Sequence, residues 1–489
     1  MTHRLGDLLA ETHHKGVCHP QDSLILGIEH DSRQIEPGDL FVAVRGSKHD
    51  GHEHICDAVR KGAAAIVGER ICSDIPANVT YITVEDSRKA LADLACAFYD
   101  RPTEKLFTVG VTGTKGKTSV THLSAAVLGL EETEIISTIT NALRRGTDQT
   151  TPEAPQIQKF AWEALQAEKP HLALEVSAHA LSQERVRGVD FNLAIFTNLS
   201  HDHLDYYGDH ELYLRAKLKL FSGLSPSATA IVNRDDPVTY RVIAALQTKV
   251  WTYGLSPNAD IWADAIELSP AGSEASVHTP QGSFRLHLHF PGIFYVQNAL
   301  AAVGVGLVRE LPLSLIRDRL EAVKHIEGRL ERFSTREGVT IIIDFAHSPD
   351  SLEKVLQLLQ PFYRRVITVF GCGGDSDRLK RPMMGAISGR LSDYTILTSD
   401  NPKGEDPEAI LREIEVGLQE MPAPYELSVN RREAIQRALK LAQAGDCVLI
   451  AGKGHERTQV FKDQQIPFND KLYLSKLGVI ACGASYRVD

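Results

Sequence analysis

The chain has 489 residues, of which 43% are hydrophobic and 24% are charged, so it is a water-soluble type of protein too long for one hydrophobic core. A net charge of −10 argues against general binding to nucleic acid or to a membrane surface, and no apolar run approaches the ~20 residues of a membrane-spanning helix. Seven cysteines without Cys-x-x-Cys spacing, and charge where a signal peptide needs an apolar run, predict a cytoplasmic protein without structural zinc or disulfides.

Short β-type runs alternate with helical patterns through the first hundred residues. The β-type runs cover 24–28, 40–44, 64–67 and 79–84, and a helical pattern covers 87–99. That pattern stops at Pro102, because proline cannot continue a helix. We therefore expect a first domain at 1–102.

Two further blocks show the same alternation, which is typical of parallel sheets covered by helices. The second has predicted strands at 106–111, 172–176, 194–197 and 228–233, a β-rich region at 250–290 and a helix at 296–307. A turn at Gly328 and Arg329 separates it from the third, whose predicted strands cover 340–344, 365–370, 394–398 and 447–450. The sequence thus predicts three α/β domains in series, at 1–102, 103–329 and 330–489.

The clearest chemical motif is a glycine loop between the predicted strand 106–111 and a helical pattern at 119–130. Glycines at 113 and 116 let backbone N–H groups turn toward phosphate oxygens, Lys117 can neutralise the outer phosphates, and the Thr118 hydroxyl can reach Mg²⁺. Val111 stands where the usual phosphate-loop pattern has its first glycine. The motif predicts use of a nucleoside triphosphate.

Three positions after the loop allow more than one interpretation. Glu175 ends a buried-type strand, where it could meet the magnesium of the triphosphate or be a surface or capping glutamate. The segment 201–205 holds two histidines and two aspartates after an apolar strand, which favours a metal site over a solvated loop. Lys217, from its helical spacing alone, is predicted to be a solvated surface lysine.

Four predicted strands of the third block each end in a segment rich in Gly, Asp, Asn or His. These segments are 344–347, 371–378, 399–403 and 452–456. Because the carboxyl ends of parallel strands meet at one edge of a sheet, we expect a second binding face there, opposite the phosphate loop.

In order along the whole chain, these and other strings resemble the Mur ligase family, in particular its MurE type. The strings are His-Asp-Ser-Arg at 30–33, Asp-Gly-His at 50–52, the glycine loop at 113–119, Thr-Thr-Pro at 150–152, Glu-Val-Ser-Ala-His at 175–179, His-Asp-His-Leu-Asp at 201–205, Glu-Gly-Arg at 327–329, Asp-Asn-Pro at 400–402 and Gly-Lys-Gly-His-Glu at 452–456.

The resemblance implies a uridine-nucleotide-binding N-terminal domain, a central P-loop ATPase-type domain and a Rossmann-like C-terminal domain. It also implies ATP-dependent addition of a diamino acid to UDP-N-acetylmuramoyl-L-alanyl-D-glutamate, with Mg²⁺, in peptidoglycan precursor synthesis. An acyl phosphate would form on the substrate carboxylate, the amine would attack it, and ADP and phosphate would be released. The partners are then small molecules, and we expect a monomer.

The resemblance also assigns roles residue by residue. Implied to bind ATP are Gly113, Thr114, Lys115, Gly116, Lys117, Thr118, Ser119, Asn298, Arg329, Asp344 and His347. Implied to bind the UDP-linked dipeptide are Ser32, Ser47, Lys48, His49, Thr150, Thr151, Ser177, Gln183 and Arg185. Implied for catalysis are Lys117, Glu175, His203 and Lys217, with Thr118, Glu175, His203 and a carbamylated Lys217 serving magnesium. Implied to bind the amino acid are Arg378, Asp400, Asn401, Lys403, Gly452 and Glu456.

The chain departs from the family pattern mainly at the amino-acid site. Ser376 replaces the arginine that holds the α-carboxylate, and Lys403 replaces the arginine of the diaminopimelate type; Ala178, Tyr295 and Phe345 are further departures. We favour meso-diaminopimelate as the amine, with L-lysine or another amine in a MurE-like paralogue as alternatives. For the function as a whole, a folylpolyglutamate-type ligase and a regulatory nucleotide switch or scaffold without catalysis are the remaining alternatives.

Overall fold

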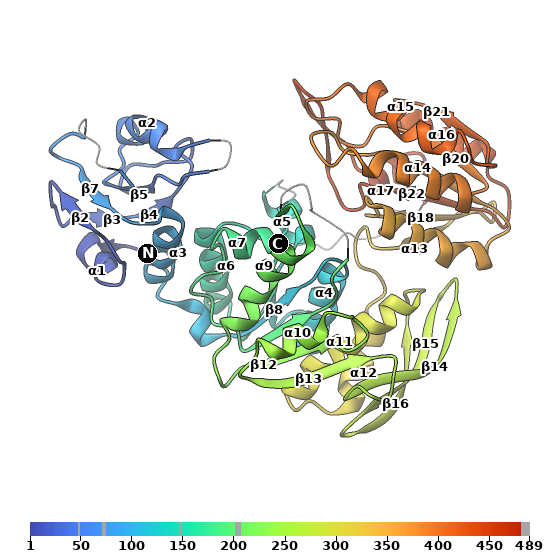
Figure 1. Ribbon diagram of the computed structural model, residues 1–489, viewed down its shortest axis with the longest axis horizontal. Helices are drawn as coiled ribbons and strands as arrows, with labels where there is room; N and C mark the ends of the chain where they lie inside the picture. Colours follow the sequence, from blue (N-terminus) through green and yellow to red (C-terminus); the bar gives the residue numbers. More distant parts are fainter. Residues whose placement is uncertain (47–48, 71–74, 146–148, 201–206, 481–489) are drawn as a thin grey trace.

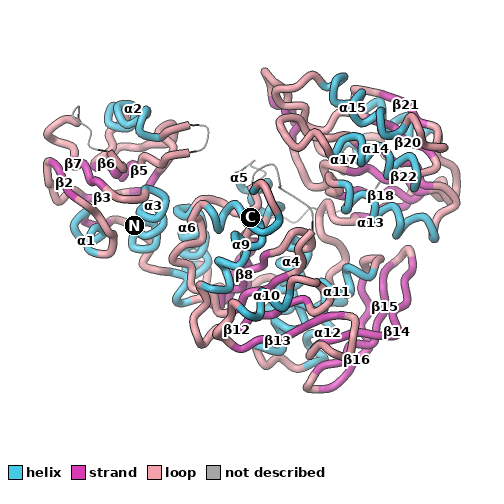
Figure 2. Tube along the Cα trace, viewed as in Figure 1, coloured by secondary structure: helices cyan, strands magenta, loops and turns pink. Residues whose placement is uncertain are grey.

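The residues described by the computed structural model, 1–46, 49–70, 75–145, 149–200 and 207–480, form three large sheets of five, nine and six strands, one in each successive part of the chain. In Figure 1 the first and third bodies lie on either side of the middle one. Figure 2 shows each sheet with helices beside it. The predicted α/β fold with three domains is therefore confirmed.

The first sheet has the strand order β2-β7-β6-β5-β4, parallel except where β2 pairs with β7. Helix α3 begins where Asp86 accepts hydrogen bonds from the first-turn N–H groups, and its buried Leu91 and Leu94 join the core of this sheet. The elements are β1 His3–Arg4, α1 Leu5–Ala10, β2 Gly16–Cys18, β3 Leu24–Ile25, β4 Gly27–Glu29, β5 Asp39–Val42, α2 Ile55–Arg60, β6 Ala65–Gly68, β7 Thr80–Thr83 and α3 Ser87–Phe98.

The middle sheet has the order β16-β15-β14-β13-β12-β11-β8-β10-β9, parallel from β9 to β14 and antiparallel from β14 to β16. The elements are β8 Phe107–Thr112, α4 Lys117–Leu128, β9 Thr133–Ile136, α5 Thr138–Arg145, α6 Ala154–Gln166, β10 His171–Glu175, α7 Ala178–Ser182, β11 Leu193–Phe196, α9 His210–Ser222, β12 Thr229–Asn233, α10 Thr239–Ala244, β13 Lys249–Gly254, β14 Ile261–Ser269, β15 Gly272–Thr279, β16 Gly282–Leu288, α11 Ile293–Val308 and α12 Leu313–Ala322. Strand β8 lies inside the sheet, so the loop that follows it opens at the edge where its neighbours also end.

The third sheet has the order β17-β18-β22-β19-β20-β21. Strands β18, β22, β19 and β20 run parallel, so the four predicted strand ends do lie at one edge. The elements are β17 Glu331–Ser334, β18 Thr340–Asp344, α13 Pro349–Leu359, β19 Val366–Phe370, α14 Lys380–Leu391, β20 Tyr394–Leu397, α15 Pro407–Leu418, β21 Tyr425–Leu427, α16 Arg431–Leu441, β22 Cys447–Ala451, β23 Thr458–Val460, β24 Gln465–Pro467 and α17 Asp470–Lys476.

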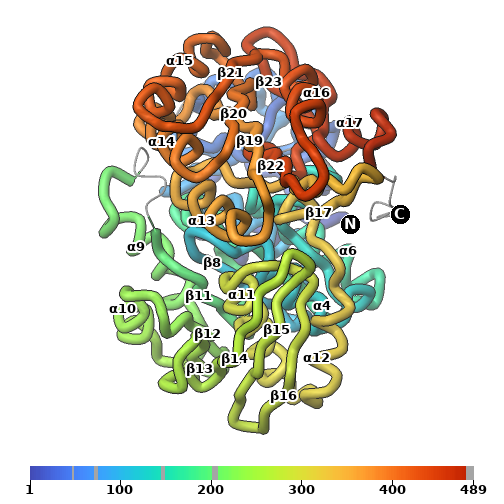
Figure 3. Tube along the Cα trace, turned by 90° about the vertical axis from the view of Figure 1, so that its right-hand side faces the viewer, coloured from blue at the N-terminus to red at the C-terminus, as the bar shows by residue number. Residues whose placement is uncertain are grey.

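The third body lies directly over the middle one in the side view of Figure 3, with α13 facing the region of α11. Among the described helices, none combines the length and the apolar character that a crossing of a lipid bilayer demands. The boundary between the second and third domains is therefore where α11 and α13, which are far apart in the sequence, face each other.

Candidate active site

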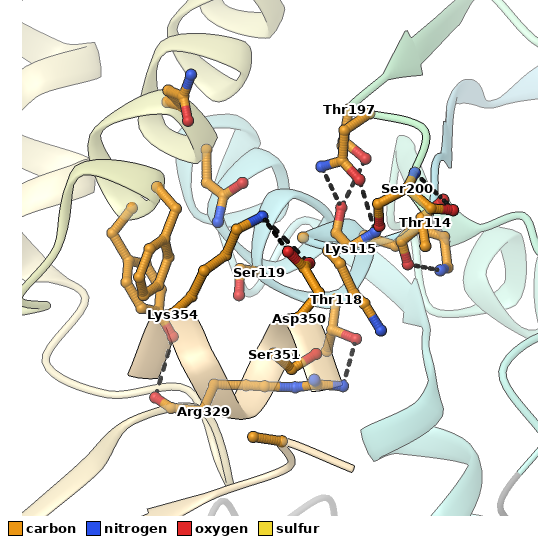
Figure 4. Close-up of a pocket in the computed structure, with 18 of the residues that line it drawn as sticks. Thr114, Lys115, Thr118, Ser119, Thr197, Ser200, Arg329, Asp350, Ser351 and Lys354 are labelled. Carbon is orange, nitrogen blue, oxygen red and sulfur yellow. Dashed lines mark hydrogen bonds and ion pairs between the residues drawn. The ribbon is translucent and has the colours of Figure 1, made fainter. Parts of the chain in front are cut away.

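A cavity of about 750 Å³ lies between the middle and third domains. Figure 4 shows its two walls: Lys115, Thr118 and Ser119 come from the glycine loop and the start of α4, whereas Asp350, Ser351 and Lys354 come from α13. The cavity therefore has a phosphate-loop wall and a helix wall that belong to different domains.

Close packing of the glycine loop explains its two glycines. Gly113 has φ +148°, and a Cβ there would lie 1.9 Å from Thr197 Oγ1. Gly116 has φ +84°, and a Cβ there would lie 2.7 Å from Asn298 Oδ1. Both positions therefore require glycine, and the second contact places Asn298 of α11 directly beside the loop, as the resemblance implies.

Lys117, Thr118 and Glu175 gather at the base of the loop. Lys117 Nζ donates hydrogen bonds to the carbonyl oxygens of Gly113 (3.1 Å) and Thr114 (2.9 Å). Glu175 is only 1% exposed and accepts a hydrogen bond from Thr138 N at 3.1 Å. Burial raises the pKa of the Glu175 carboxyl, while Lys117 and a hydrogen bond from Thr118 act in the opposite direction. The alternative of a surface glutamate is wrong, whereas the contact with Thr138, the first residue of α5, is of the capping kind.

Lys217 is buried, which makes the prediction from its spacing alone wrong. Its side chain is 1% exposed, Nζ donates a hydrogen bond to Gly113 O at 2.7 Å, and Nζ lies 4.2 Å from the centre of the Tyr213 ring. The signal that could have revealed this is the apolar stripe of α9, because Tyr213, Leu220 and Phe221 are buried on the same face as Lys217. A lysine inside an apolar stripe is a stronger indication of function than a helical lysine in general.

The predicted metal segment at 201–205, with His203, lies outside the described residues. Within the described part of the chain, no three His, Cys, Asp or Glu side chains are grouped as a metal site. Thr118 and Glu175 near the loop carry oxygen atoms of the chemical type that Mg²⁺ prefers.

A second cavity of about 270 Å³ adjoins the loop, with Lys117 and Lys217 in its wall. Four of the residues implied to bind the UDP-linked dipeptide also line it: Thr150, Ser177, Gln183 and Arg185. Thr151 connects two segments of this wall by hydrogen bonds. Its hydroxyl donates to Glu175 O (2.8 Å) and its carbonyl accepts from Arg185 Nη1 (2.8 Å). A carboxylate bound in this cavity would meet both lysines.

The other residues implied for the dipeptide substrate belong to the first domain. Ser32 and His49 line neither of the two cavities. Ser47 and Lys48 lie outside the described residues. Asp50, beside His49, has its Oδ1 2.6 Å from Nδ1 of His52, so the turn that carries His49 is anchored at its end.

Arg329 links the loop to the third domain. Its Nη2 donates a hydrogen bond to Thr118 Oγ1 at 2.9 Å (Figure 4), and its guanidinium lies 4.7 Å from the centre of the Phe345 ring. Tyr295, one of the departures from the family pattern, donates its hydroxyl to Arg329 O at 3.0 Å. The tyrosine thus holds the interdomain segment against α11.

Asp344 ends β18 and His347 follows it, and both lie in the cavity wall. Asp344 accepts a hydrogen bond from Leu330 N at 2.8 Å, and burial raises the pKa of its carboxyl. Nδ1 of His347 lies 2.7 Å from Phe345 O. The structure therefore brings the implied ATP residues of the third domain to the cavity that the glycine loop lines.

At the carboxyl edge of the third sheet, four of the residues implied for the amino acid come together. Asn401 Nδ2 donates to Glu456 Oε2 at 2.8 Å, and a Cβ on Gly452 would lie 2.4 Å from Asp400 Oδ2. Asp400, Asn401 and Glu456 are all buried. This cluster is the core of the predicted second binding face.

Two of the residues implied to bind the amino acid, Arg378 and Lys403, are exposed and do not belong to the buried cluster. Arg378 is exposed and paired with Glu413, and its replacement of the missing arginine stays a prediction. Ser376 instead donates its hydroxyl to Gly373 O at 2.8 Å. Lys403 is exposed beside the cluster, and its backbone N–H donates to Val460 O at 2.9 Å.

Two buried cations at this edge have no role assigned from the sequence. Arg381 is fully buried and hydrogen-bonded to Glu405 and Glu413, and Lys453 is fully buried between Asn401 and Glu456. The Gly-Lys-Gly-His-Glu string contains Lys453, but a loop position gives no sign that a lysine is enclosed.

Comparison with known families gives three matches that together span most of the chain. Residues 24–99 match the family described as "Mur ligase family, catalytic domain", residues 111–306 match "Mur ligase middle domain", and residues 328–454 match "Mur ligase, glutamate ligase domain".

Two relatives are similar over nearly their full length. Both are named UDP-N-acetylmuramoyl-L-alanyl-D-glutamate–2,6-diaminopimelate ligase. The one from Syntrophomonas wolfei is 40% identical, covering 94% of this chain and 95% of its own. The one from Gloeobacter violaceus is 42% identical, covering 96% of both chains.

Solved structures show the same architecture. One titled as a UDP-N-acetylmuramoyl-L-alanyl-D-glutamate–2,6-diaminopimelate ligase has a TM-score of 0.66 and 30% identity, with 97% of this chain and 98% of that chain covered. The MurF ligase of Thermotoga maritima in complex with ADP has a TM-score of 0.64 at 19% identity, with 87% and 93% covered, and supports the fold alone.

Proposed function

The chain belongs to the Mur ligase family, and from that premise we propose that it joins 2,6-diaminopimelate to UDP-N-acetylmuramoyl-L-alanyl-D-glutamate with consumption of ATP. The observation that carries the proposal is the identity of 40–42% to ligases of this name over 94–96% of the chain. Similarity of that extent spans the nucleotide loop, the substrate cavity and the amino-acid edge together.

The proposed chemistry begins with activation of a carboxylate. A carboxylate is a poor electrophile, so the γ-phosphoryl group of ATP is transferred to it first, and the amine then displaces phosphate from the acyl phosphate. Phosphoryl transfer depends on positioning and on neutralisation of the phosphoryl oxygens. Lys117 supports this assignment because it lines both cavities.

We propose Thr118 and Glu175 as residues that would hold magnesium. Their hydroxyl and carboxylate oxygens suit a hard cation, and a buried carboxylate with a raised pKa is stabilised when a cation is present. When bound, the metal neutralises phosphate charge. Lys217 is proposed to contribute as a carbamate, and His203 keeps the role that the resemblance implies.

The acceptor is proposed to bind at the edge formed by Asp400, Asn401, Gly452 and Glu456. The distal ammonium of a diamino acid fits the buried Glu456 carboxylate, and the exposed Lys403 can meet a distal carboxylate as a point charge. Such a carboxylate distinguishes diaminopimelate from L-lysine. As an enzyme of a soluble nucleotide-linked precursor, the protein is proposed to act in the cytoplasm as a monomer.

A direct assay tests the proposal. The purified protein is incubated with UDP-N-acetylmuramoyl-L-alanyl-D-glutamate, ATP and Mg²⁺, and with meso-diaminopimelate, L-lysine or other amines in turn. Mass spectrometry of the amide and release of phosphate are measured together. We expect diaminopimelate to be the preferred amine. Preference for another amine would leave a ligase with a different acceptor, whereas ATP binding without any amide would contradict the function.

A further inference from the structure

Lys453 lies at the point where two loops of the amino-acid edge meet. It belongs to the loop after β22, and its side chain is 0% exposed. Nζ donates hydrogen bonds to Glu456 Oε2 at 2.6 Å and to Asn401 Oδ1 at 2.9 Å. Asn401 comes from the loop after β20, so one ammonium group joins the two segments proposed to hold the acceptor.

The contacts of Lys453 determine how the Asn401 amide is turned. A lysine ammonium has only donors, so the group facing it must be the amide oxygen. Val460 N donates to the same Oδ1 at 3.1 Å. With the oxygen fixed by two donors, the amide nitrogen faces Glu456, where Nδ2 donates to Oε2 at 2.8 Å. Lys453, Asn401 and Glu456 thus form a closed ring of hydrogen bonds.

The charges nearby give Lys453 a specific counterion. Arg431 and Asp470 are both fully enclosed and are joined by two hydrogen bonds of 2.8 Å. Asp470 is the hydrogen-bonded partner of Arg431, on which Glu456 also acts electrostatically, whereas Lys453 is the cation that donates a hydrogen bond to the Glu456 carboxylate. A buried carboxylate without its cation would become protonated or leave the interior.

We propose that Lys453 is a positioning residue of the acceptor pocket: it pairs with the Glu456 carboxylate and holds it turned into the edge, and it fixes the orientation of the Asn401 amide. The inference rests on the proposed function, because Glu456 is there assigned to the acceptor ammonium. Lys453 acts through Glu456 and Asn401 rather than on the reacting atoms. Its removal must therefore affect amine binding selectively.

Steady-state kinetics of the full-length enzyme test this assignment. Lys453→Met is expected to raise the KM for diaminopimelate at least 30-fold, while the KM values for ATP and for the UDP-linked dipeptide change less than 3-fold. Lys462→Met is the matched control, because Lys462 is an exposed lysine of the same domain, and it should leave all three KM values unchanged.

A double-mutant cycle separates positioning from general damage. If Lys453 acts through Glu456, then adding Lys453→Met to Glu456→Gln should raise the KM for the amine less than 3-fold further. This comparison also serves if Lys453→Met alone does not fold, since the double variant leaves no buried unpaired carboxylate. Additive effects, or equal rises in all three KM values, would overturn the inference.

Amide formation by the wild type distinguishes failure of the positioning role of Lys453 from failure of the proposed function. If the wild type forms an amide with any amine, the cycle is measured with that amine, and an unchanged KM in Lys453→Met overturns this inference alone. If the wild type forms no amide, the proposed function fails, and the positioning role fails with it.

Discussion

Lys115 of the glycine loop donates a hydrogen bond from Nζ to the Ser348 hydroxyl at 2.8 Å, joining residues 233 positions apart. Ser348 directly precedes α13, whose first turn lines the far wall of the larger cavity. The contact therefore connects the phosphate loop to the domain that must close over it. A ligase with an acyl phosphate intermediate needs this closure, because water would hydrolyse the intermediate.

Loss of this contact should weaken nucleotide binding. We expect Lys115→Met to raise the KM for ATP about 10-fold, because both a cation near the phosphates and an interdomain hydrogen bond are removed. Ser348→Ala removes only the second, and should raise the KM for ATP about 3-fold. Lys159→Met, on the exposed face of α6, is the control. Unchanged KM values in both cavity variants would contradict an interdomain role for Lys115.

Lys117 should be required for chemistry rather than for binding of the peptide substrate. Lys117→Ala is expected to lower kcat by about 10³-fold, in line with the loss of one preorganised charge in a transition state. Binding of UDP-N-acetylmuramoyl-L-alanyl-D-glutamate, measured by calorimetry, should change little. If the variant keeps a tenth of the wild-type rate, Lys117 does not neutralise the transferred phosphoryl group.

The sequence predicts most of the fold because strand and helix signals are local. The predicted strand 340–344 coincides with β18, and the parallel direction of β18, β22, β19 and β20 agrees with the α/β alternation. The predicted helix 119–130 begins two residues earlier in the structure, at Lys117, because Gly116 adopts φ +84° and lets the first turn start inside the loop.

Side-chain burial is predicted less well, because it depends on what a helix or loop packs against. The glycine loop identifies Gly113 and Lys117 directly. The apolar stripe of α9 indicates that Lys217 is buried but not that it reaches Gly113 O, and nothing local shows that Lys453 is enclosed. Arg378 illustrates the opposite case, since it lies only two residues from Ser376 in the sequence, yet its exposed guanidinium pairs with Glu413.

His122 should make the stability of the middle domain sensitive to mild acid. Its half-buried ring lies in α4 with Nε2 3.0 Å from Ser137 Oγ, and burial, with Arg329 adding to it, lowers its pKa to about 4. Between pH 6.5 and 4 the unfolded state therefore binds more protons than the folded state, so the free energy of unfolding falls as the pH falls. From pH 7.5 to 5.0 we expect His122 to account for a loss of roughly 1 to 2 kcal/mol.

Urea unfolding at pH 7.5 and 5.0 measures the contribution of His122 to the free energy of unfolding. His122→Gln keeps a polar group near Ser137 without the titration, so its loss of stability between pH 7.5 and 5.0 should be smaller than that of the wild type by the same amount. Equal losses in the two proteins would show that His122 is protonated in the folded state without cost.

Lys403 should discriminate between amines. Its ammonium is exposed beside Asn401 and can meet the distal carboxylate that diaminopimelate has and L-lysine lacks. Lys403→Ala is expected to raise the KM for diaminopimelate about 10-fold and the KM for L-lysine less than 2-fold. Lys403→Arg should retain the preference, because a guanidinium can also bind a carboxylate. Equal changes for both amines would remove Lys403 from the acceptor site.

Lys217 is predicted to act as a carbamate. Reaction of a lysine with CO₂ needs a neutral amine, and the enclosed position of Lys217 penalises the ammonium form. The product is an anion, placed next to the loop that carries Lys117 and Thr118. Lys217→Ala should therefore lower kcat at least 100-fold, and short-chain carboxylic acids should restore part of the activity, because they supply an anion to the space left by the side chain.

The matched control for this variant is Lys219→Ala, two residues along α9, where the side chain is exposed and pairs with Glu184. It should leave kcat unchanged with or without added acid. Carbon-13 NMR of the protein in labelled bicarbonate gives a readout independent of activity, since the wild type should show a carbamate signal that Lys217→Ala lacks. An active Lys217→Ala variant, or a wild type without the signal, would mean that the buried ammonium serves only to hold Gly113 O and the loop.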